Sequence, residues 1–137
     1  PPNSGRRQRQ MCIRDRPDTG YEAPKDFVFS QPVWEFQAHT APLGIKFYDG
    51  ESFPEYYKNG AFVAQHGSWN RSEKVGYRLL FMKMEEGDVV SADVFIDGWM
   101  SNETSWGRPV TPLILKDGSM LISDDQADSI IRVTYKG

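Results

Sequence analysis

The sequence predicts an all-β fold built from short antiparallel strands. Runs rich in β-branched and aromatic residues recur between Gly, Asp, Asn and Pro residues, a pattern typical of strands separated by turns. No window sustains the apolar spacing of an amphipathic helix. Asp49-Gly50 and Asp117-Gly118 each follow one of these runs, where glycine accepts the positive φ that a tight turn requires.

Length and composition predict one soluble globular unit. A chain of 137 residues with 39% hydrophobic and 13% aromatic residues can bury one ordinary core. Residues 1–16 hold five of the 16 basic residues and one of the 19 acidic residues, so the rest of the chain is acidic. An acidic body argues against nucleic acid as a partner. No apolar run approaches the roughly 18 residues of a transmembrane helix.

The N-terminal part divides into two segments without strand character. Residues 1–16 are polar and arginine-rich, and 11–16 match a translated transposon end used in sequencing libraries, so we expect a non-native, adaptor-derived leader. A natural basic tail is the alternative. Cys12, the one cysteine, lies in this leader, so no disulfide or zinc site is expected. Residues 17–32 contain three prolines and predict an irregular, extended segment.

Residues 33–137 predict two consecutive blades of a β-propeller. The expected strands, in chain order, are 33–36, 44–48, 61–65, 77–84, 89–96, 110–115, 120–123 and 130–135. GIKFYDG, AFVAQHG and GYRLLF in the first half have counterparts in PLILKDG, SMLISDD and SIIRVT in the second. Repeated meanders of up to four strands are the signature of propeller blades. A small antiparallel sandwich of seven or eight strands also fits the pattern.

Three polar and aromatic clusters adjoin these strands, where a propeller presents its loops to ligands. They are 39–44, 65–72 and 106–110. Arginine offers a planar fork for carboxylates, and tryptophan offers a face for a flat ring. Taken singly, the tryptophans also fit core packing, the arginines surface ion pairs and the histidines ordinary loop positions. The candidate site residues are His39, Thr40, His66, Trp69, Arg71, Trp106 and Arg108.

The segments AHTAPLGIKFYDGESFP, FVAQHGSWNRS, GYRLLFM, SWGRPV and DGSMLISDDQADSIIRVTY resemble, in order and spacing, the end of sorbosone dehydrogenase-like proteins. These are pyrroloquinoline-quinone (PQQ) dehydrogenases of the glucose/sorbosone type. The resemblance implies a six-bladed β-propeller, of which this chain carries about the last two blades. It also implies PQQ, often with calcium, and oxidation of an aldose or sugar-derived aldehyde by hydride transfer to the quinone. An external electron acceptor and a periplasmic or secreted location follow by the same resemblance.

The resemblance also assigns roles to individual residues. Arg108 resembles an arginine that contacts the cofactor's carboxylates, and His39 and Thr40 resemble a polar pair lining the same pocket. His66, Trp69 and Arg71 lie in the loop where related soluble glucose dehydrogenases carry a cofactor-binding lysine. Since 65–72 contain no lysine, Arg71 is a hypothetical substitute.

No catalytic base and no metal ligand is expected in this chain. The family's base histidine and its usual calcium ligands belong to earlier blades, so the fragment is expected to be inactive alone. Asp124-Asp125 predicts one turn carboxylate and one solvent-exposed carboxylate, because neighbouring residues at a strand end point to opposite sides. The alternative function is a non-catalytic propeller that binds a carbohydrate or a protein, since fold does not fix function.

Overall fold

The computed structural model describes residues 30–137. The expected leader at 1–16 and all but the last three residues of the expected 17–32 segment lie outside the described residues. The chain divides into two compact units, residues 1–38 and 39–137, which we describe separately.

The described part of the first unit contains no strand. The strand predicted at 33–36 is therefore wrong. A strand forms only where a neighbour takes its backbone hydrogen bonds, and no strand pairing of the described residues includes this run. Pro32, directly before it, also lacks a backbone donor.

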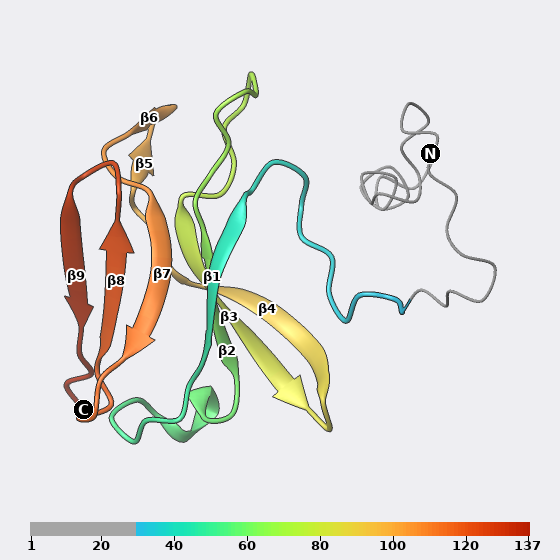
Figure 1. Ribbon diagram of the computed structural model, residues 1–137, viewed down its shortest axis with the longest axis vertical. Coiled ribbons are helices and arrows are strands. Elements are labelled where there is room, and N and C mark those ends of the chain that lie inside the picture. The colour runs from blue at the N-terminus through green and yellow to red at the C-terminus, as the bar shows by residue number, and fades with distance from the viewer. Residues whose placement is uncertain (1–29) are drawn as a thin grey trace. The chain divides into compact units, whose positions relative to one another are not determined.

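The second unit contains two antiparallel meanders and a short hairpin (Figure 1). The first sheet has the order β1-β2-β3-β4 and the second the order β7-β8-β9. The β5–β6 hairpin and a short 3₁₀ helix, η2, lie in the connections. Their bounds are β1 (Pro42–Phe47), η2 (Glu55–Tyr57), β2 (Ala61–Gln65), β3 (Arg78–Glu85), β4 (Asp88–Ile96), β5 (Met100–Ser101), β6 (Thr104–Ser105), β7 (Pro109–Ile114), β8 (Met120–Asp124) and β9 (Ser129–Val133).

The two sheets lie side by side through their first strands. β7 lies against β1 and β2, whereas the outer strands β4 and β9 diverge from each other (Figure 1). A sandwich would instead stack the two sheets face to face along all their strands. The fan of two meanders is the arrangement of neighbouring propeller blades, so the structure confirms the predicted all-β propeller fragment.

The core fills the wedge between the two sheets. Alternation along β2 and β3 directs Phe62 and Phe81 into it, and alternation along β8 does the same for Ile122. All three side chains are at most 1% exposed. The sheets lie close together at Gly44, where an added Cβ would lie 2.6 Å from the Cα of Thr111.

Each sheet also has apolar side chains that remain exposed. Leu43, Ile45 and Phe47 alternate along β1, and each is more than half exposed. Leu113 and Ile130 are exposed in the second sheet. Propeller blades pack on neighbours through both faces, and these residues are apolar as such packing requires.

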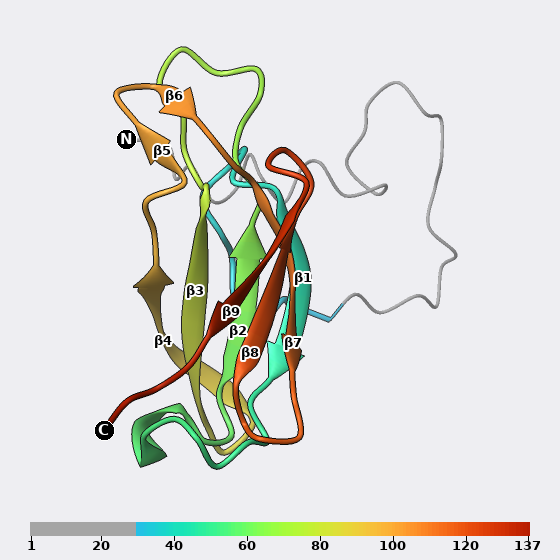
Figure 2. The same ribbon diagram turned by 90° about the vertical axis from the view of Figure 1, so that its left-hand side faces the viewer.

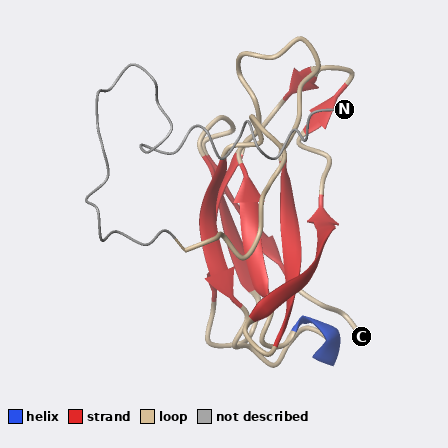
Figure 3. Ribbon diagram, turned by 90° about the vertical axis from the view of Figure 1, so that its right-hand side faces the viewer, coloured by secondary structure: helices blue, strands red, loops and turns tan. Residues whose placement is uncertain are grey.

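Two ends of this unit can be distinguished in the side views. Figure 2 shows the β5–β6 hairpin and the loop between β2 and β3 projecting at the same end. Figure 3 shows η2 at the opposite end. We call the end with the hairpin the loop end.

Candidate functional site

Four loops of the second unit converge at the loop end. Residues 39–41 precede β1, and 106–108 precede β7. Residues 66–77 connect β2 to β3, and 125–128 connect β8 to β9. The antiparallel register places the start of β1 beside the end of β2, and the start of β7 beside the end of β8. The three clusters predicted from the sequence therefore lie at one end of the two sheets.

Arg108 joins the two sheets at this end. Its Nε donates to the backbone oxygen of His66 at 3.1 Å, and its Nη2 donates to that of Gly67 at 2.5 Å. Its guanidinium carbon lies 5.4 Å from the centroid of the Tyr77 ring, within the range of a cation–π contact. Within the described residues no hydrogen bond uses Nη1. Arg108 is thus held in a fixed orientation with donors left for a carboxylate.

The loop at 66–77 is shaped by its own contacts. Gly67 has a φ of +99°, and an added Cβ would lie 2.5 Å from the Tyr77 ring, so only glycine fits there. The Tyr77 hydroxyl donates to the backbone oxygen of Ser68, and the Ser68 N–H donates to the oxygen of Val75 at 2.9 Å. These bonds fix the two carbonyls that hold Arg108.

His66 and Asp125 form a second link between the two sheets. His66 Nε2 lies 2.9 Å from Oδ1 and 3.1 Å from Oδ2 of Asp125. The His66 side chain is 16% exposed and that of Asp125 is 60% exposed. The hydrogen bond from His66 is the main cause that lowers the pKa of Asp125, and the charge of Arg108 acts in the same direction. Asp125 is therefore ionised at neutral pH and ties the β8–β9 turn to the loop after β2.

Asp124 has a structural role in the same turn. Its Oδ1 accepts hydrogen bonds from the backbone N–H groups of Arg108, Gln126 and Ala127 at 2.9, 3.1 and 2.8 Å. The residue is 3% exposed, and Oδ2 is buried with no partner among the described residues. Of the two carboxylates, Asp124 is the turn carboxylate that the sequence predicts. Asp125 is exposed as predicted, but it also binds His66.

The tryptophans of the loop end differ in how they are held. Trp106 stacks on buried Trp99, with ring centroids 6.2 Å apart, and its Nε1 donates to the backbone oxygen of Gly98 at 2.6 Å. It nevertheless remains 55% exposed, so one face of a fixed indole is open. Trp69 is 83% exposed. Neither side chain belongs to the core, which was the alternative considered from the sequence.

Three predicted site residues are not joined to the His66–Arg108 contacts by their side chains. Arg71 is exposed, and its Nε donates to the backbone oxygen of Glu73 at 2.7 Å, within its own loop. His39 is exposed, with a φ of +69°. Thr40 is fully buried, and its backbone oxygen accepts from the N–H of Gly67 at 2.9 Å. Thr40 thus supports the loop through its backbone.

The β5–β6 hairpin is bonded to both sheets at the loop end. Lys74 donates from its backbone N–H to Glu103 Oε2 at 2.8 Å and from Nζ to the Glu103 backbone oxygen at 2.6 Å. On the other side, Gln126 Nε2 donates to the backbone oxygen of Ser105 at 2.8 Å. The hairpin therefore bridges the loops of the two blades. The sequence predicts no strand between 96 and 110, because two-residue strands are too short to give a periodic pattern.

The sequence also did not indicate Tyr77 and Asp125 as partners of Arg108 and His66. Tyr77 was assigned to a strand, and its positive φ of 56° places it in the loop instead. Asp125 lies 59 residues from His66, and no local pattern connects the two. Only the packing of the two sheets brings them together.

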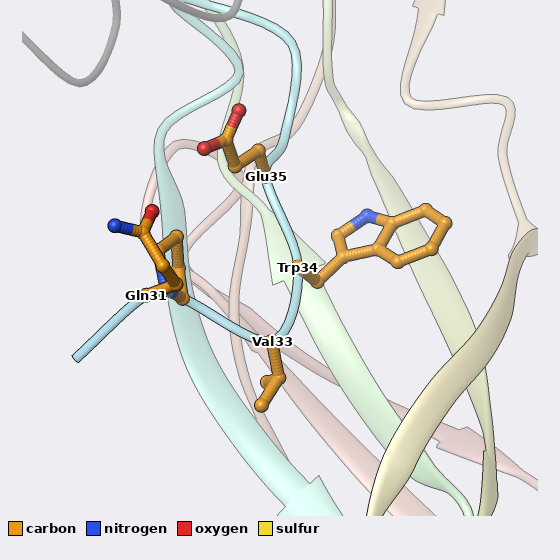
Figure 4. Close-up of a pocket in the computed structure, with 5 residues that line it drawn as sticks. Gln31, Val33, Trp34 and Glu35 are labelled. Carbon is orange, nitrogen blue, oxygen red and sulfur yellow. The ribbon is translucent and has the colours of Figure 1, made fainter.

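No metal centre is found within residues 30–137, where no three His, Cys, Asp or Glu side chains gather as ligands. The same residues include no helix with the length and hydropathy to span a bilayer. One pocket is lined by residues 31–35 of the first unit. Figure 4 shows Gln31, Val33, Trp34 and Glu35 pointing in different directions around it, without converging on a common point. It contains none of the predicted site residues.

Solved structures share this fold. A Trichoderma reesei protein of Carbohydrate-Active Enzymes Family AA12, whose structure contains iodide, is 24% identical with a TM-score of 0.62. The PQQ domain of pyranose dehydrogenase from Coprinopsis cinerea is 22% identical with a TM-score of 0.54, and a glucose dehydrogenase is 19% identical with a TM-score of 0.56. The matches cover 76%, 71% and 78% of this chain and 27% of each of the solved chains. At these identities the likeness shows the fold alone.

Sequence comparisons identify the family. An uncharacterized protein of Borreliella burgdorferi (strain ATCC 35210) is 41% identical over 118 residues, which cover 84% of this chain and 31% of that protein. This chain therefore spans about a third of the length of this curated relative. The family model described as TrAA12-like matches residues 21–136, nearly all of the chain. The chain belongs to the TrAA12-like family.

Proposed function

We propose that this chain is the C-terminal part of a PQQ-dependent oxidoreductase that oxidises an aldose or a sugar-derived aldehyde. Family membership and the PQQ domain among the structures of the same fold support the cofactor. The name of the glucose dehydrogenase and the carbohydrate-active class of the AA12 structure support a sugar as substrate. A sorbosone-type substrate rests on the sequence resemblance alone.

The orientation of Arg108 is the observation that carries this proposal. PQQ has three carboxylates, and a guanidinium fixed by two backbone carbonyls offers its remaining N–H groups without a further loss of side-chain freedom. Since Arg108 is only partly buried, its open side faces a solvent-accessible space. The donor set at the loop end therefore fits an anionic, flat cofactor.

Most of the other candidate residues of the loop end would contact the ligand around Arg108. The open face of Trp106 and the exposed Trp69 would pack against a ring. His66 would accept a hydrogen bond from the ligand, and His39 would line the edge of the site near β1. The buried Thr40 would support this edge through its backbone, and Arg71 would reorient to a second carboxylate. When bound, the cofactor supplies the two-electron acceptor, and the residues of this chain bind and orient it.

Calcium, the electron acceptor and the location complete the proposal. One AA12 structure of the same fold contains calcium. By the sequence resemblance, we place calcium and the catalytic base in the remaining blades of the longer protein. That protein would be periplasmic or secreted and would reduce an external acceptor, and this chain alone would bind without turnover.

A matched pair of arginine variants tests the cofactor site. Arg108→Gln should weaken PQQ binding to the full-length protein about tenfold or more, as measured by quenching of tryptophan fluorescence. Arg132→Gln removes the same charge from a residue whose partner, Asp117, lies in the β7–β8 turn at the opposite end, and it should change the affinity less than twofold. Equal effects of both variants would refute a specific site at Arg108.

The second candidate function is a non-catalytic propeller that binds a carbohydrate or a protein. The exposed tryptophans at the loop end are the observation that favours it, because open aromatic faces suit recognition without chemistry. If saturating PQQ does not quench the tryptophan fluorescence, and if no sugar causes reduction of an artificial electron acceptor, this function is favoured over the first.

A further inference from the structure

The contact between His66 and Asp125 is a feature that the family resemblance does not include. It joins residues 59 positions apart and lies directly against Arg108, whose Nε binds the backbone oxygen of the same histidine. The pair therefore lies at the proposed cofactor site and not on a remote surface.

The contact geometry defines which ring nitrogen carries a proton. Both oxygens of Asp125 lie within 3.1 Å of His66 Nε2, and an ionised carboxylate only accepts hydrogen bonds. Nε2 must therefore carry a hydrogen. In a neutral imidazole the other nitrogen, Nδ1, then has a lone pair and accepts a hydrogen bond.

Nδ1 has no partner among the described residues. The hydrogen bonds of the His66 side chain all go from Nε2 to Asp125, yet the side chain is only 16% exposed. The ring is mostly covered, and one of its nitrogens is already hydrogen-bonded. The other nitrogen is therefore suited to accept a hydrogen bond from a ligand.

We propose that Asp125 is a positioning residue, which holds His66 in the tautomer with the proton on Nε2 and keeps Nδ1 as a fixed acceptor for an O–H or N–H donor of the bound ligand. The inference deepens the proposed function, on which its ligand rests. The donor is either a hydroxyl group of the sugar or an N–H group of the cofactor. Arg108 and His66 then divide recognition, with Arg108 binding an anionic group and His66 binding a donor group.

Positioning of His66 by Asp125 and a simple charge effect of Asp125 predict changes of opposite sign in the affinity for an anionic ligand. Asp125 is negative and lies close to Arg108, so its charge alone opposes the binding of an anion beside Arg108. If Asp125 acted only through charge, its removal would strengthen the binding of an anionic cofactor. If Asp125 acts by positioning His66, its removal weakens the binding of a ligand that needs the Nδ1 acceptor.

The first measurement is the ¹⁵N spectrum of His66 in the chain, recorded at increasing pH until the ring signals no longer change. We expect the signature of a protonated Nε2 and an unprotonated Nδ1 in the unaltered chain. Asp125→Ala should give a mixture of tautomers, and Asp125→Asn an intermediate result, because an amide can either accept from or donate to Nε2. Asp128→Asn, an isosteric change in the same turn at a residue with a φ of +48° that Asn tolerates, should leave the spectrum unchanged.

The second measurement is ligand affinity, with PQQ alone and with D-glucose added to the PQQ-loaded full-length protein. Loss of about tenfold in PQQ affinity in Asp125→Ala identifies the cofactor's N–H as the donor, whereas an unchanged PQQ affinity with about tenfold weaker glucose binding identifies the sugar hydroxyl. Tighter PQQ binding with unchanged glucose binding, or an unchanged tautomer in Asp125→Ala, would overturn the proposal.

These outcomes also separate the inference from the proposed function. If the unaltered protein binds no PQQ while the ¹⁵N spectrum shows the Asp125-dependent tautomer, the proposed function fails and the positioning of His66 stands. If Arg108→Gln abolishes PQQ binding while Asp125→Ala changes neither spectrum nor affinity, the proposed function stands and this inference fails.

Discussion

The phenol of Tyr48 links the two sheets at the end opposite the site, and Tyr48→Phe isolates that link. Its hydroxyl accepts the backbone N–H of Phe53 at 2.8 Å and donates to the backbone oxygen of Gly118, 70 positions away, at 3.0 Å. The residue is 1% exposed. Phenylalanine would keep the ring contacts with Phe53 and Phe62, so the substitution removes only the two hydrogen bonds.

The expected loss follows from the two groups left without a partner. A buried N–H or C=O that loses its hydrogen bond destabilises the fold by about 1 to 3 kcal/mol. Taking the lower part of that range for each group, Tyr48→Phe should reduce the free energy of unfolding by about 2 to 3 kcal/mol. For a folded unit of roughly 100 residues this lowers the midpoint of thermal unfolding by about 10 °C.

Thermal and urea unfolding of the chain, followed by circular dichroism, measure this loss. Tyr56→Phe is the matched control, because the Tyr56 hydroxyl is exposed and lies 3.5 Å from Asp93 Oδ2, so it should change stability by less than about 0.5 kcal/mol. If Tyr48→Phe and Tyr56→Phe lose the same small amount, the hydroxyl of Tyr48 does not hold the sheets together and the reasoning is refuted.

Two further substitutions test the packing and the charges of the same unit. Gly44→Ala should destabilise the chain by about 1 to 3 kcal/mol in urea unfolding, because the new Cβ would lie 2.6 Å from the backbone of Thr111, and an unchanged midpoint would show that the sheets can separate locally. The pKa of Asp117 is lowered chiefly by hydrogen bonds from Ser119, so the stability it contributes is present above about pH 4 and lost as the pH falls through the lowered pKa. Asp117→Asn should therefore lower the unfolding midpoint at pH 7 and match the unaltered chain once the pH lies well below the lowered pKa of Asp117. A difference that persists there would assign the effect to packing.

The sheets could be predicted from the sequence because their signals are local. The β-branched and aromatic runs of β2 and β3 and the Asp117-Gly118 turn each need only a few consecutive residues, and the structure confirms these two strands within one position. Gly118 has the expected positive φ of 79°, whereas the positive φ expected at Gly50 is wrong. The run at 33–36 has the same composition but forms no strand, because strand formation depends on a partner as well as on propensity. The halves of the repeat also predicted the two sheets, since each copy encodes one meander.

The site was only partly predictable, for a physical reason that Arg108 and Asp125 illustrate. Placing the loops at one end requires only the direction of each strand, which the order of turns supplies. Predicting which loop residues contact each other also requires the distance between the two sheets. That distance is set by contacts such as those of Gly44 with Thr111 and of Tyr48 with Gly118. No sequence spacing encodes it.

Because the geometry of the site depends on the distance between the two sheets, stability and ligand binding are connected in this fold. The carbonyls that orient Arg108 lie in the loop after β2 of the first sheet, whereas Arg108 directly precedes β7 of the second. The carboxylate that orients His66 likewise comes from a loop of the second sheet, directly after β8. A change that separates the sheets at Tyr48 or Gly44 should therefore weaken ligand binding at the loop end without touching a ligand, and the loss should grow with the loss of stability. If Tyr48→Phe and Gly44→Ala lose stability yet bind PQQ with the affinity of the unaltered protein, the loop end holds its geometry independently of the core.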